Sequence, residues 1–312
     1  MQQESSQKYR LVTRSNFDGI ASAALLKTAD MVDEMRFVHP HDIQSGKIEI
    51  TRHDIVTNLP YVDSAYMAFD HRLESDEGVR LNPWHALYTD AGSVTEVIYH
   101  YYGGEARFGS EMRPLIDAAN RSKNADFTPE EIENPEGWDL LIFLTDPRTG
   151  LGRFHDFRIS NYALMQKLPD LMRTQAIEEI LEDPDVRERA EMYSAYQNRF
   201  VMQLQRCTVN YGDIAVVDLR EEPVIYPGNR FMLYACYPQI ATSIHIFPAK
   251  SPDKTVIALG NTIFGEARRR RIDEIVTRYG GGGHADAGTC QVPTDNCHRV
   301  TDEIISLLKK EA

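Results

Sequence analysis

The sequence predicts an α/β protein with two domains, because strand-like and helix-like segments alternate along it and their texture changes once. Apolar strand-like segments alternate with helical patterns near the start of the chain, which predicts a parallel sheet. Residues 91–205 are mostly helical in pattern, and short strand-like segments separated by turn residues follow Cys207. A chain of 312 residues is long enough for two domains. We expect domains at residues 1–195 and 209–312, with a linker at 196–208.

The strands expected in the first domain end in polar residues. The candidate strands are residues 11–13, 36–38 and 65–69, and the alanine-rich run after Asp18 is typical of a helix that reaches about Lys27. His39 follows the second strand, and Asp70 and His71 follow the third. Ligand sites of parallel sheets lie beyond the carboxyl ends of the strands, so we expect these side chains to line a site.

The second domain combines short strands with two helices. We expect strands at residues 213–217, 231–234, 243–247, 255–258 and 289–292, and a helix over 272–279. A last helix begins at a cap formed by Thr294 or Asp295, and it carries four apolar residues on one face, namely Val300, Ile304, Ile305 and Leu308.

Composition excludes several classes of function. The net charge of −13 argues against a surface built for duplex DNA, although it leaves room for a local basic groove. The four cysteines form no CxxC pair, which argues against a zinc knuckle and favours a reduced, cytoplasmic chain. The N-terminus is polar, so we expect no signal peptide. The sequence has no apolar run of about 18 residues, so we expect no membrane partner.

The most informative stretch is a run of four glycines before a histidine, Gly280-Gly281-Gly282-Gly283-His284. Glycine backbone takes positive φ readily and lets a ligand approach closely, and successive N–H groups can form an anion cradle. A helix starting just after the run would add its positive end. We interpret the run as a phosphate cradle with His284 at its mouth. The alternative is a flexible linker, but such linkers are usually Ser-rich and lie between domains.

Three motifs together resemble the DHH (Asp-His-His) phosphoesterase superfamily. They are Asn16-Phe17-Asp18-Gly19 after one strand, Asp70-His71-Arg72 after another, and the glycine–histidine run. Their order and spacing fit over nearly the whole chain, and the stretches at 39–40 and 149–154 look like its exopolyphosphatase-like branch. The resemblance implies a parallel-sheet DHH-like domain, a smaller DHH-associated α/β domain with a mixed sheet, and a cleft between them.

The resemblance also implies a chemistry, which is metal-assisted hydrolysis of a phosphoanhydride or phosphodiester. The substrate would be polyphosphate, a short oligonucleotide or a cyclic dinucleotide, and the expected partner is a small anionic phosphate or nucleotide ligand. Two Mn²⁺ or Mg²⁺ ions would activate a water and stabilise the developing charge, and such ions prefer carboxylates, with imidazole tolerated by Mn²⁺. A homodimer is one option for the assembly.

Most site residues follow from these motifs, and His39, Asp146 and Arg268 are added as further candidates. Asp70 and His71 match the first two residues of the signature triplet and are the expected catalytic residues. The expected metal ligands are Asp18, Asp70, His71, His39 and Asp146. The expected substrate-binding residues are Gly281, Gly282, Gly283, His284, Arg268 and Arg72. Structural alternatives stay open, because Asp18 can cap a helix, Asp146 can form a turn, and a lone histidine such as His39 is often structural.

The metal-ligand set looks depleted. Asn16 stands where the family has an aspartate, Arg72 stands where it has a histidine, and Asn120 and Lys123 occupy the likely acidic positions of a third motif. An amide is a poor ligand for a divalent ion, and a guanidinium cannot ligate one. We therefore expect one ion or none, with Arg72 paired to Asp18 or Asp70.

Two functions remain open on this basis. The first is an active metal-dependent phosphohydrolase. The second is an impaired homologue that binds a nucleotide or polyphosphate without turnover. The arginine run at 268–271, just before the glycines, favours an anionic ligand in either case, although it can also be an exposed basic face.

Overall fold

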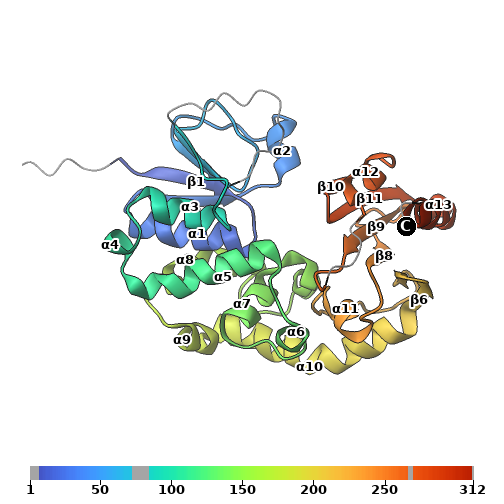
Figure 1. The fold of residues 1–312 in the computed structure, drawn as a ribbon. Helices are drawn as coiled ribbons and strands as arrows, with labels where there is room; N and C mark the ends of the chain where they lie inside the picture. Colours follow the sequence, from blue (N-terminus) through green and yellow to red (C-terminus); the bar gives the residue numbers. More distant parts are fainter. Residues whose placement is uncertain (1–6, 72–83, 266–269, 311–312) are drawn as a thin grey trace, which may run out of the picture. The chain divides into compact units, whose positions relative to one another are not determined.

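The computed structural model describes residues 7–71, 84–265 and 270–310, and its chain divides into two compact units (Figure 1). The first unit comprises the chain up to Asp126 together with Pro135–Met192. The second comprises Phe127–Asn134 and the chain from Tyr193 onwards. Each unit is built around a sheet of its own.

The sheet of the first unit has five parallel strands in the order β2-β1-β3-β4-β5. The strands are β1 Tyr9–Thr13, β2 Val32–Phe37, β3 Asp54–Thr57, β4 Met67–Asp70 and β5 His85–Leu87. This confirms the predicted parallel sheet. The sequence analysis identified β1, β2 and β4 but missed β3 and β5, which have only four and three residues.

Most helices of the first unit pack on one another rather than directly on this sheet. The helices of this unit are α1 Phe17–Thr28, α2 Pro40–Gln44, α3 Val94–Tyr101, α4 Glu105–Phe108, α5 Arg113–Asn124, α7 Gly137–Thr145, α8 Asn161–Met172 and α9 Ile177–Glu182, with short 3-10 helices η1 Ser110–Met112, η2 Pro147–Thr149 and η3 Leu151–Arg153. The long helix α10, Pro184–Cys207, begins in the first unit and ends in the second. Helix α1 contacts α3, α5 and α8 (Figure 1), which is why its residues from Phe17 to Leu26 are all buried.

The second unit has a six-stranded mixed sheet in the order β10-β11-β9-β8-β7-β6. Its strands are β6 Thr208–Tyr211, β7 Ile214–Asp218, β8 Thr242–Pro248, β9 Lys254–Asn261, β10 Gly282–His284 and β11 Ala287–Pro293. Strands β7 and β8 are parallel, and the other neighbours are antiparallel. The mixed sheet agrees with the family expectation.

One face of this mixed sheet carries the core of the second unit. The helical elements of the unit are α6 Pro129–Glu133, α11 Met232–Cys236, α12 Ile272–Thr277, η4 Thr294–Asn296 and α13 Cys297–Lys310. Side chains of α12 and α13 join those of β7, β8, β9 and β11 in one apolar cluster. The predicted apolar face of α13, made by Val300, Ile304, Ile305 and Leu308, is buried in this cluster, which confirms the prediction.

The predicted strand at residues 231–234 is wrong, because Met232–Cys236 forms the short helix α11. The side chain of Asn229 accepts a hydrogen bond from Phe231 N at 2.9 Å, and Met232 N donates to Asn229 O at 3.0 Å, which begins the helical turn. Met232, Leu233 and Tyr234 are all buried, so the apolar run has no polar face. A short run of this kind does not distinguish a strand from a buried helix.

None of the helices in the described ranges combines the length and the apolar character that crossing a bilayer requires.

Candidate functional site

Polar residues gather at the carboxyl edge of the parallel sheet, after β1, β3 and β4. The chain reverses direction across the sheet between β1 and β3, and ligand sites of open α/β sheets lie at such a switch point. Val12 of β1 pairs with Val56 of β3, and Thr57 of β3 pairs with Phe69 of β4. The residues that follow Thr57 and Phe69 are Asn58 and Asp70, at neighbouring strand ends. Neighbouring strands are about 4.8 Å apart, which places these two residues within one site.

Asp70 and His71, the predicted catalytic pair, lie together at this edge. Asp70 ends β4, is half-buried, and its Oδ1 accepts a hydrogen bond from His71 N at 2.8 Å. The His71 side chain is only 4% exposed, and its Nδ1 lies 3.9 Å from Asp70 Oδ1. The hydrogen bond from His71 N holds the Asp70 carboxylate next to the histidine. The pair therefore provides one acid and one imidazole from adjacent residues.

His85 is a neighbour that the sequence analysis did not single out. It begins β5, beside Ala68 of β4, and its ring stacks on Tyr61 with centroids 4.5 Å apart. Burial lowers the pKa of His85, and the charge of Asp70 opposes this by raising it. Both ring nitrogens are buried and have no hydrogen-bond partner in the described part of the chain. The three-residue strand carries no motif, so only the pairing with β4 reveals this histidine.

Asp18 lies at the start of α1 and is buried, with 1% of its surface exposed. Its Oδ1 accepts hydrogen bonds from Thr95 N at 3.0 Å and Thr95 Oγ1 at 2.7 Å, and Val94 N lies 3.3 Å from Oδ2. These donors form the first turn of α3, whose positive end favours a carboxylate. Asp18 therefore holds the beginning of α3 against α1.

Lys123, near the end of α5, points at the same carboxylate. Its Nζ lies 3.9 Å from Asp18 Oδ2 and donates a hydrogen bond to Asn58 Oδ1 at 3.1 Å. Its side chain is 21% exposed, so the ammonium is partly withdrawn from water. A cation therefore stands between the buried acid of α1 and the amide that follows β3.

The two asparagines found at expected acidic positions have structural partners. Asn16 is the N-cap of α1, and its Oδ1 accepts a hydrogen bond from Gly19 N at 2.9 Å. Asn120 accepts from Ser93 Oγ at 2.7 Å and donates to Glu96 Oε2 at 3.1 Å. Both amides thus stabilise helix starts, Asn16 directly and Asn120 through the Ser93 cap of α3.

Other expected metal ligands lie apart from this group or outside the description. His39 is exposed directly after β2. Asp146 follows α7, accepts from Arg148 N, and forms an ion pair with the Arg148 guanidinium at 2.7 Å. Within residues 7–71, 84–265 and 270–310, no three His, Cys, Asp or Glu side chains are grouped closely enough to hold an ion. Arg72 and Arg268 lie outside the described residues.

The glycine run forms an edge strand of the second unit. Gly280, with φ of +71°, follows α12, and Gly282–His284 is β10, which pairs with β11. The expected contribution of a following helix is therefore absent, because the run leads directly into a β-hairpin. The sequence suggested a loop because glycine disfavours strands, but pairing with β11 overrides that preference.

Individual glycines of the run serve different purposes. A Cβ on Gly281 would lie 2.3 Å from Thr289 O, and one on Gly283 would lie 2.3 Å from Ala287 O. These two residues are needed for the close approach of β10 to β11 and α12. A Cβ on Gly282 would meet nothing within 4 Å, so packing does not explain its lack of a side chain.

Gly282 and His284 lie on the sheet face opposite α12 and α13. The register aligns Gly282 with Thr289, Ala258 and His245, and it aligns His284 with Ala287, Gly260 and Ser243. Residues that alternate with these on β8, β9 and β11 belong to the apolar core. His284 is exposed, and its Nδ1 accepts from Asp286 N at 3.3 Å. On this face, Gly282 and His284 are exposed, whereas His245 is half-buried.

The described part of the arginine run is structural. Arg270 is 2% exposed and donates to Leu308 O, Thr242 Oγ1 and both carboxylate oxygens of Asp213 at 2.9–3.0 Å. Arg271 is exposed and pairs with Asp273 at 2.8 Å. Both arginines form ion pairs within the second unit. Neither of them therefore supports a phosphate-binding role for the arginine run.

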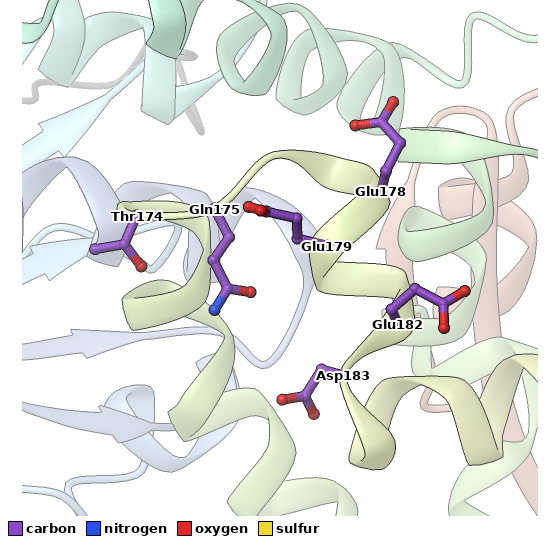
Figure 2. A pocket seen from close by; sticks show the side chains of 6 residues that line it. All are labelled: Thr174, Gln175, Glu178, Glu179, Glu182 and Asp183. Atoms are coloured by element: carbon purple, nitrogen blue, oxygen red, sulfur yellow. The ribbon is translucent and has the colours of Figure 1, made fainter.

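A separate surface hollow of about 630 Å³ lies at the α8–α9 turn (Figure 2). Its lining is mostly acidic and consists of Thr174, Gln175, Glu178, Glu179, Glu182 and Asp183. Asp183 is paired with Lys167 at 2.7 Å, and Glu179 accepts from Ala176 N at 3.1 Å. None of the residues that follow the parallel strands contributes to this hollow.

Comparison with solved structures decides the family. The pGpG-specific phosphodiesterase PggH from Vibrio cholerae is similar over 98% of this chain and 100% of its own, with 43% sequence identity and a TM-score of 0.84. The chain belongs to the DHH phosphoesterase family. The resemblance carried by Asp18, the Asp70–His71 pair and the glycine run is therefore confirmed.

More distant members of the DHH superfamily share the fold. RecJ in complex with Mn²⁺ from Thermus thermophilus has 11% identity and a TM-score of 0.53 over 97% of this chain and 52% of RecJ. CDC45 from Entamoeba histolytica has 8% identity and a TM-score of 0.54 over 95% of this chain and 94% of that chain. No family model matches the chain, and a search of curated proteins gave no match.

Proposed function

We propose that this DHH-family protein hydrolyses the phosphodiester bond of a short linear dinucleotide of the pGpG type. The observation that carries the proposal is the full-length similarity to PggH at 43% identity. The Asp70–His71 pair at the carboxyl edge of the sheet supports it, because an acid and an imidazole at that edge suit phosphoryl transfer. Polyphosphate and cyclic dinucleotides, the other substrates expected from the sequence, are the alternatives that the experiment below compares with pGpG.

The chain's own residues divide into two roles. Asp70 and His71 would act at the scissile phosphate, and the backbone bond between them holds the carboxylate in place before substrate arrives. Gly282 and His284 would bind a phosphate through bare backbone N–H groups and an exposed imidazole. Gly281 and Gly283 would keep that strand close to β11, and Arg72 and Arg268 are retained as proposed phosphate contacts.

Asp70 and His71 fit one Mn²⁺ or Mg²⁺ ion. Ions of this kind are often held by one or two side chains together with water and substrate phosphate oxygens, and Mn²⁺ accepts imidazole. A bound ion would lower the pKa of a water and neutralise charge that develops on the phosphate. The residues around Asp18 do not fit a second ion, since its carboxylate already accepts backbone N–H groups and faces Lys123.

The proposal is tested by incubating the protein with pGpG, pApA, cyclic di-GMP and polyphosphate, with and without Mn²⁺, and separating the products by chromatography. We expect mononucleotide to appear from pGpG. Asp70→Asn should reduce turnover by about 10³-fold, because it removes the acid at the scissile phosphate. Asp117→Asn, an exposed residue of α5, is the matched control. Release of phosphate from polyphosphate alone would contradict the proposal.

A second candidate function is nucleotide binding without turnover. The observation that favours it is the replacement of acids around Asp18 by Asn16, Asn120 and Lys123. This function predicts that pGpG raises the melting temperature without being cleaved, because a ligand of the folded state stabilises it. The shift would persist in EDTA and weaken in His284→Ala.

A further inference from the structure

The two acids of the site have different surroundings. Asp70 is half-buried at the end of a strand, with its side chain 19% exposed. Asp18 is enclosed, and the first turn of α3 supplies N–H and O–H donors to both of its oxygens. A carboxylate whose lone pairs are directed at fixed donors has little capacity left to coordinate a metal ion.

Lys123 supplies the positive charge at Asp18. Its ammonium lies 3.9 Å from Asp18 Oδ2, and the bond to Asn58 Oδ1 at 3.1 Å fixes the direction of the side chain. A divalent ion at this carboxylate would stand beside a permanent cation with little water between them. Like charges at this separation repel each other, so the Asp18 carboxylate binds either the Lys123 ammonium or a metal ion, but not both.

The ammonium also faces the reacting edge of the sheet. Asn58, its hydrogen-bond partner, follows Thr57 of β3, and Thr57 pairs with Phe69, the residue before Asp70. Paired strands are about 4.8 Å apart, so Asn58 and Asp70 belong to adjoining strand ends. A phosphate group at these strand ends is therefore within reach of Lys123, whose ammonium carries three N–H donors.

We propose that Lys123 is a fixed cation of the active site, which takes the place of a metal ion at Asp18 and binds an oxygen of the substrate phosphate. The chain then uses at most one exchangeable ion, held at Asp70 and His71. The phosphate contact rests on the proposed function, whereas the replacement of an ion at Asp18 does not. The alternative is a purely structural lysine that joins α5 to β3.

Ion stoichiometry tests the replacement directly, by titrating Mn²⁺ into the full-length protein in a calorimeter. We expect the wild-type chain to bind no more than one ion. Lys123→Glu exchanges the cation for a carboxylate beside Asp18, and we expect it to bind one ion more than the wild-type chain. Lys27→Glu is the control, because Lys27 also pairs with an aspartate, Asp170 at 2.7 Å, on the outside of the unit. Two ions in the wild-type chain would overturn the proposal.

Turnover of pGpG tests the phosphate contact. Lys123→Gln should lower kcat by about 100-fold, as the loss of one preorganised donor at a developing charge typically does. Lys123→Arg keeps the charge and should recover part of that loss, whereas a structural role would make the larger guanidinium as harmful as Gln. Equal loss in both variants, or turnover within twofold of wild type in Lys123→Gln, would refute the contact.

The two measurements separate failure of this inference from failure of the proposed function. If the wild-type chain does not cleave pGpG but binds no more than one Mn²⁺, the substrate proposal fails and the fixed cation stands. If the wild-type chain cleaves pGpG and binds two ions, the proposal for Lys123 is refuted and the substrate proposal remains. Because the stoichiometry is measured on the wild-type chain, this outcome does not depend on a variant that folds poorly.

Discussion

The carboxyl edge of the parallel sheet and the glycine edge strand of the mixed sheet present opposite kinds of surface. At the first, side chains fill the space, and a buried acid, two amides and an ammonium are tied to one another or to helix starts. At the second, β10 is almost bare backbone, and only His284 carries a side chain. One edge offers charge, and the other offers peptide N–H groups.

Because of this difference, substitutions at the two edges should affect stability and chemistry in different ways. Replacing a side chain at the polar edge removes partners from buried groups, so both stability and chemistry should change. Replacing a glycine in β10 adds atoms, so the result depends on whether a neighbour already occupies the space. The four predictions below test this contrast.

Asp18→Ala should have the largest effect on stability. It leaves the buried N–H groups of α3 without their acceptor and the Lys123 ammonium without its counter-charge, which should lower the free energy of unfolding by about 3–5 kcal/mol. Urea denaturation followed by circular dichroism measures this. Asp117→Ala, which breaks an exposed pair with Arg113, should cost less than about 0.5 kcal/mol. Equal losses in the two variants would contradict the role of Asp18 as the acceptor that holds α3.

Arg270→Met should be nearly as damaging in the second unit. The buried guanidinium binds Leu308 O, Thr242 and Asp213, and its loss should lower the free energy of unfolding by about 2–3 kcal/mol. The figure stays below that for Asp18 because Asp213 is 46% exposed and keeps water as a partner. The neighbouring Arg271→Met, at an exposed position, is the control and should leave the free energy of unfolding almost unchanged.

Gly281→Ala, just before β10, and Gly282→Ala, at its first residue, should separate an effect on the fold from an effect on binding. A Cβ at Gly281 collides with Thr289 O and should reduce stability by about 1–3 kcal/mol. Gly282→Ala has free space and should unfold like wild type, but the methyl group should weaken pGpG binding if a phosphate rests on that backbone. Thermal melts and calorimetric titration with pGpG measure the two effects. Unchanged binding by Gly282→Ala would remove the phosphate role from β10.

His245 should give the smallest effect, and one that depends on pH. Burial, followed by the charge of Arg230, lowers its pKa from 6.5 to about 4. The unfolded chain then binds more protons than the folded one between these values, so stability is complete above pH 6.5 and falls as the pH drops towards 4. His245→Gln should remove about 1–2 kcal/mol of the loss seen at pH 5. Parallel stability curves for the variant and wild type from pH 7 to pH 5 would contradict the lowered pKa.

Local patterns predicted a good part of this structure. The apolar face of α13 and the Asp70–His71 pair could be located because each depends on residues adjacent or regularly spaced in the chain. The parallel sheet followed from the alternation of strands and helices. Family motifs then indicated which strand ends carry chemistry.

Contacts between distant residues could not be predicted in the same way. Lys123 and Asn58 are 65 residues apart, and His85 enters the site only through the pairing of a very short strand. The register of β10 against β11 decides which glycines have room for a side chain, and the bare sequence makes all four look alike. The positions of Arg72 and Arg268 remain predictions.

The bond between Asp18 and Thr95 ties together two helix starts that are 77 residues apart in the chain. Neither α1 nor α3 can detach alone without exposing the other's buried partner, so the two should open as a single cooperative unit. Slow amide exchange at Thr95 would then report on the docking of α1, and the first motif of the site would become ordered only after the chain had been made as far as α3.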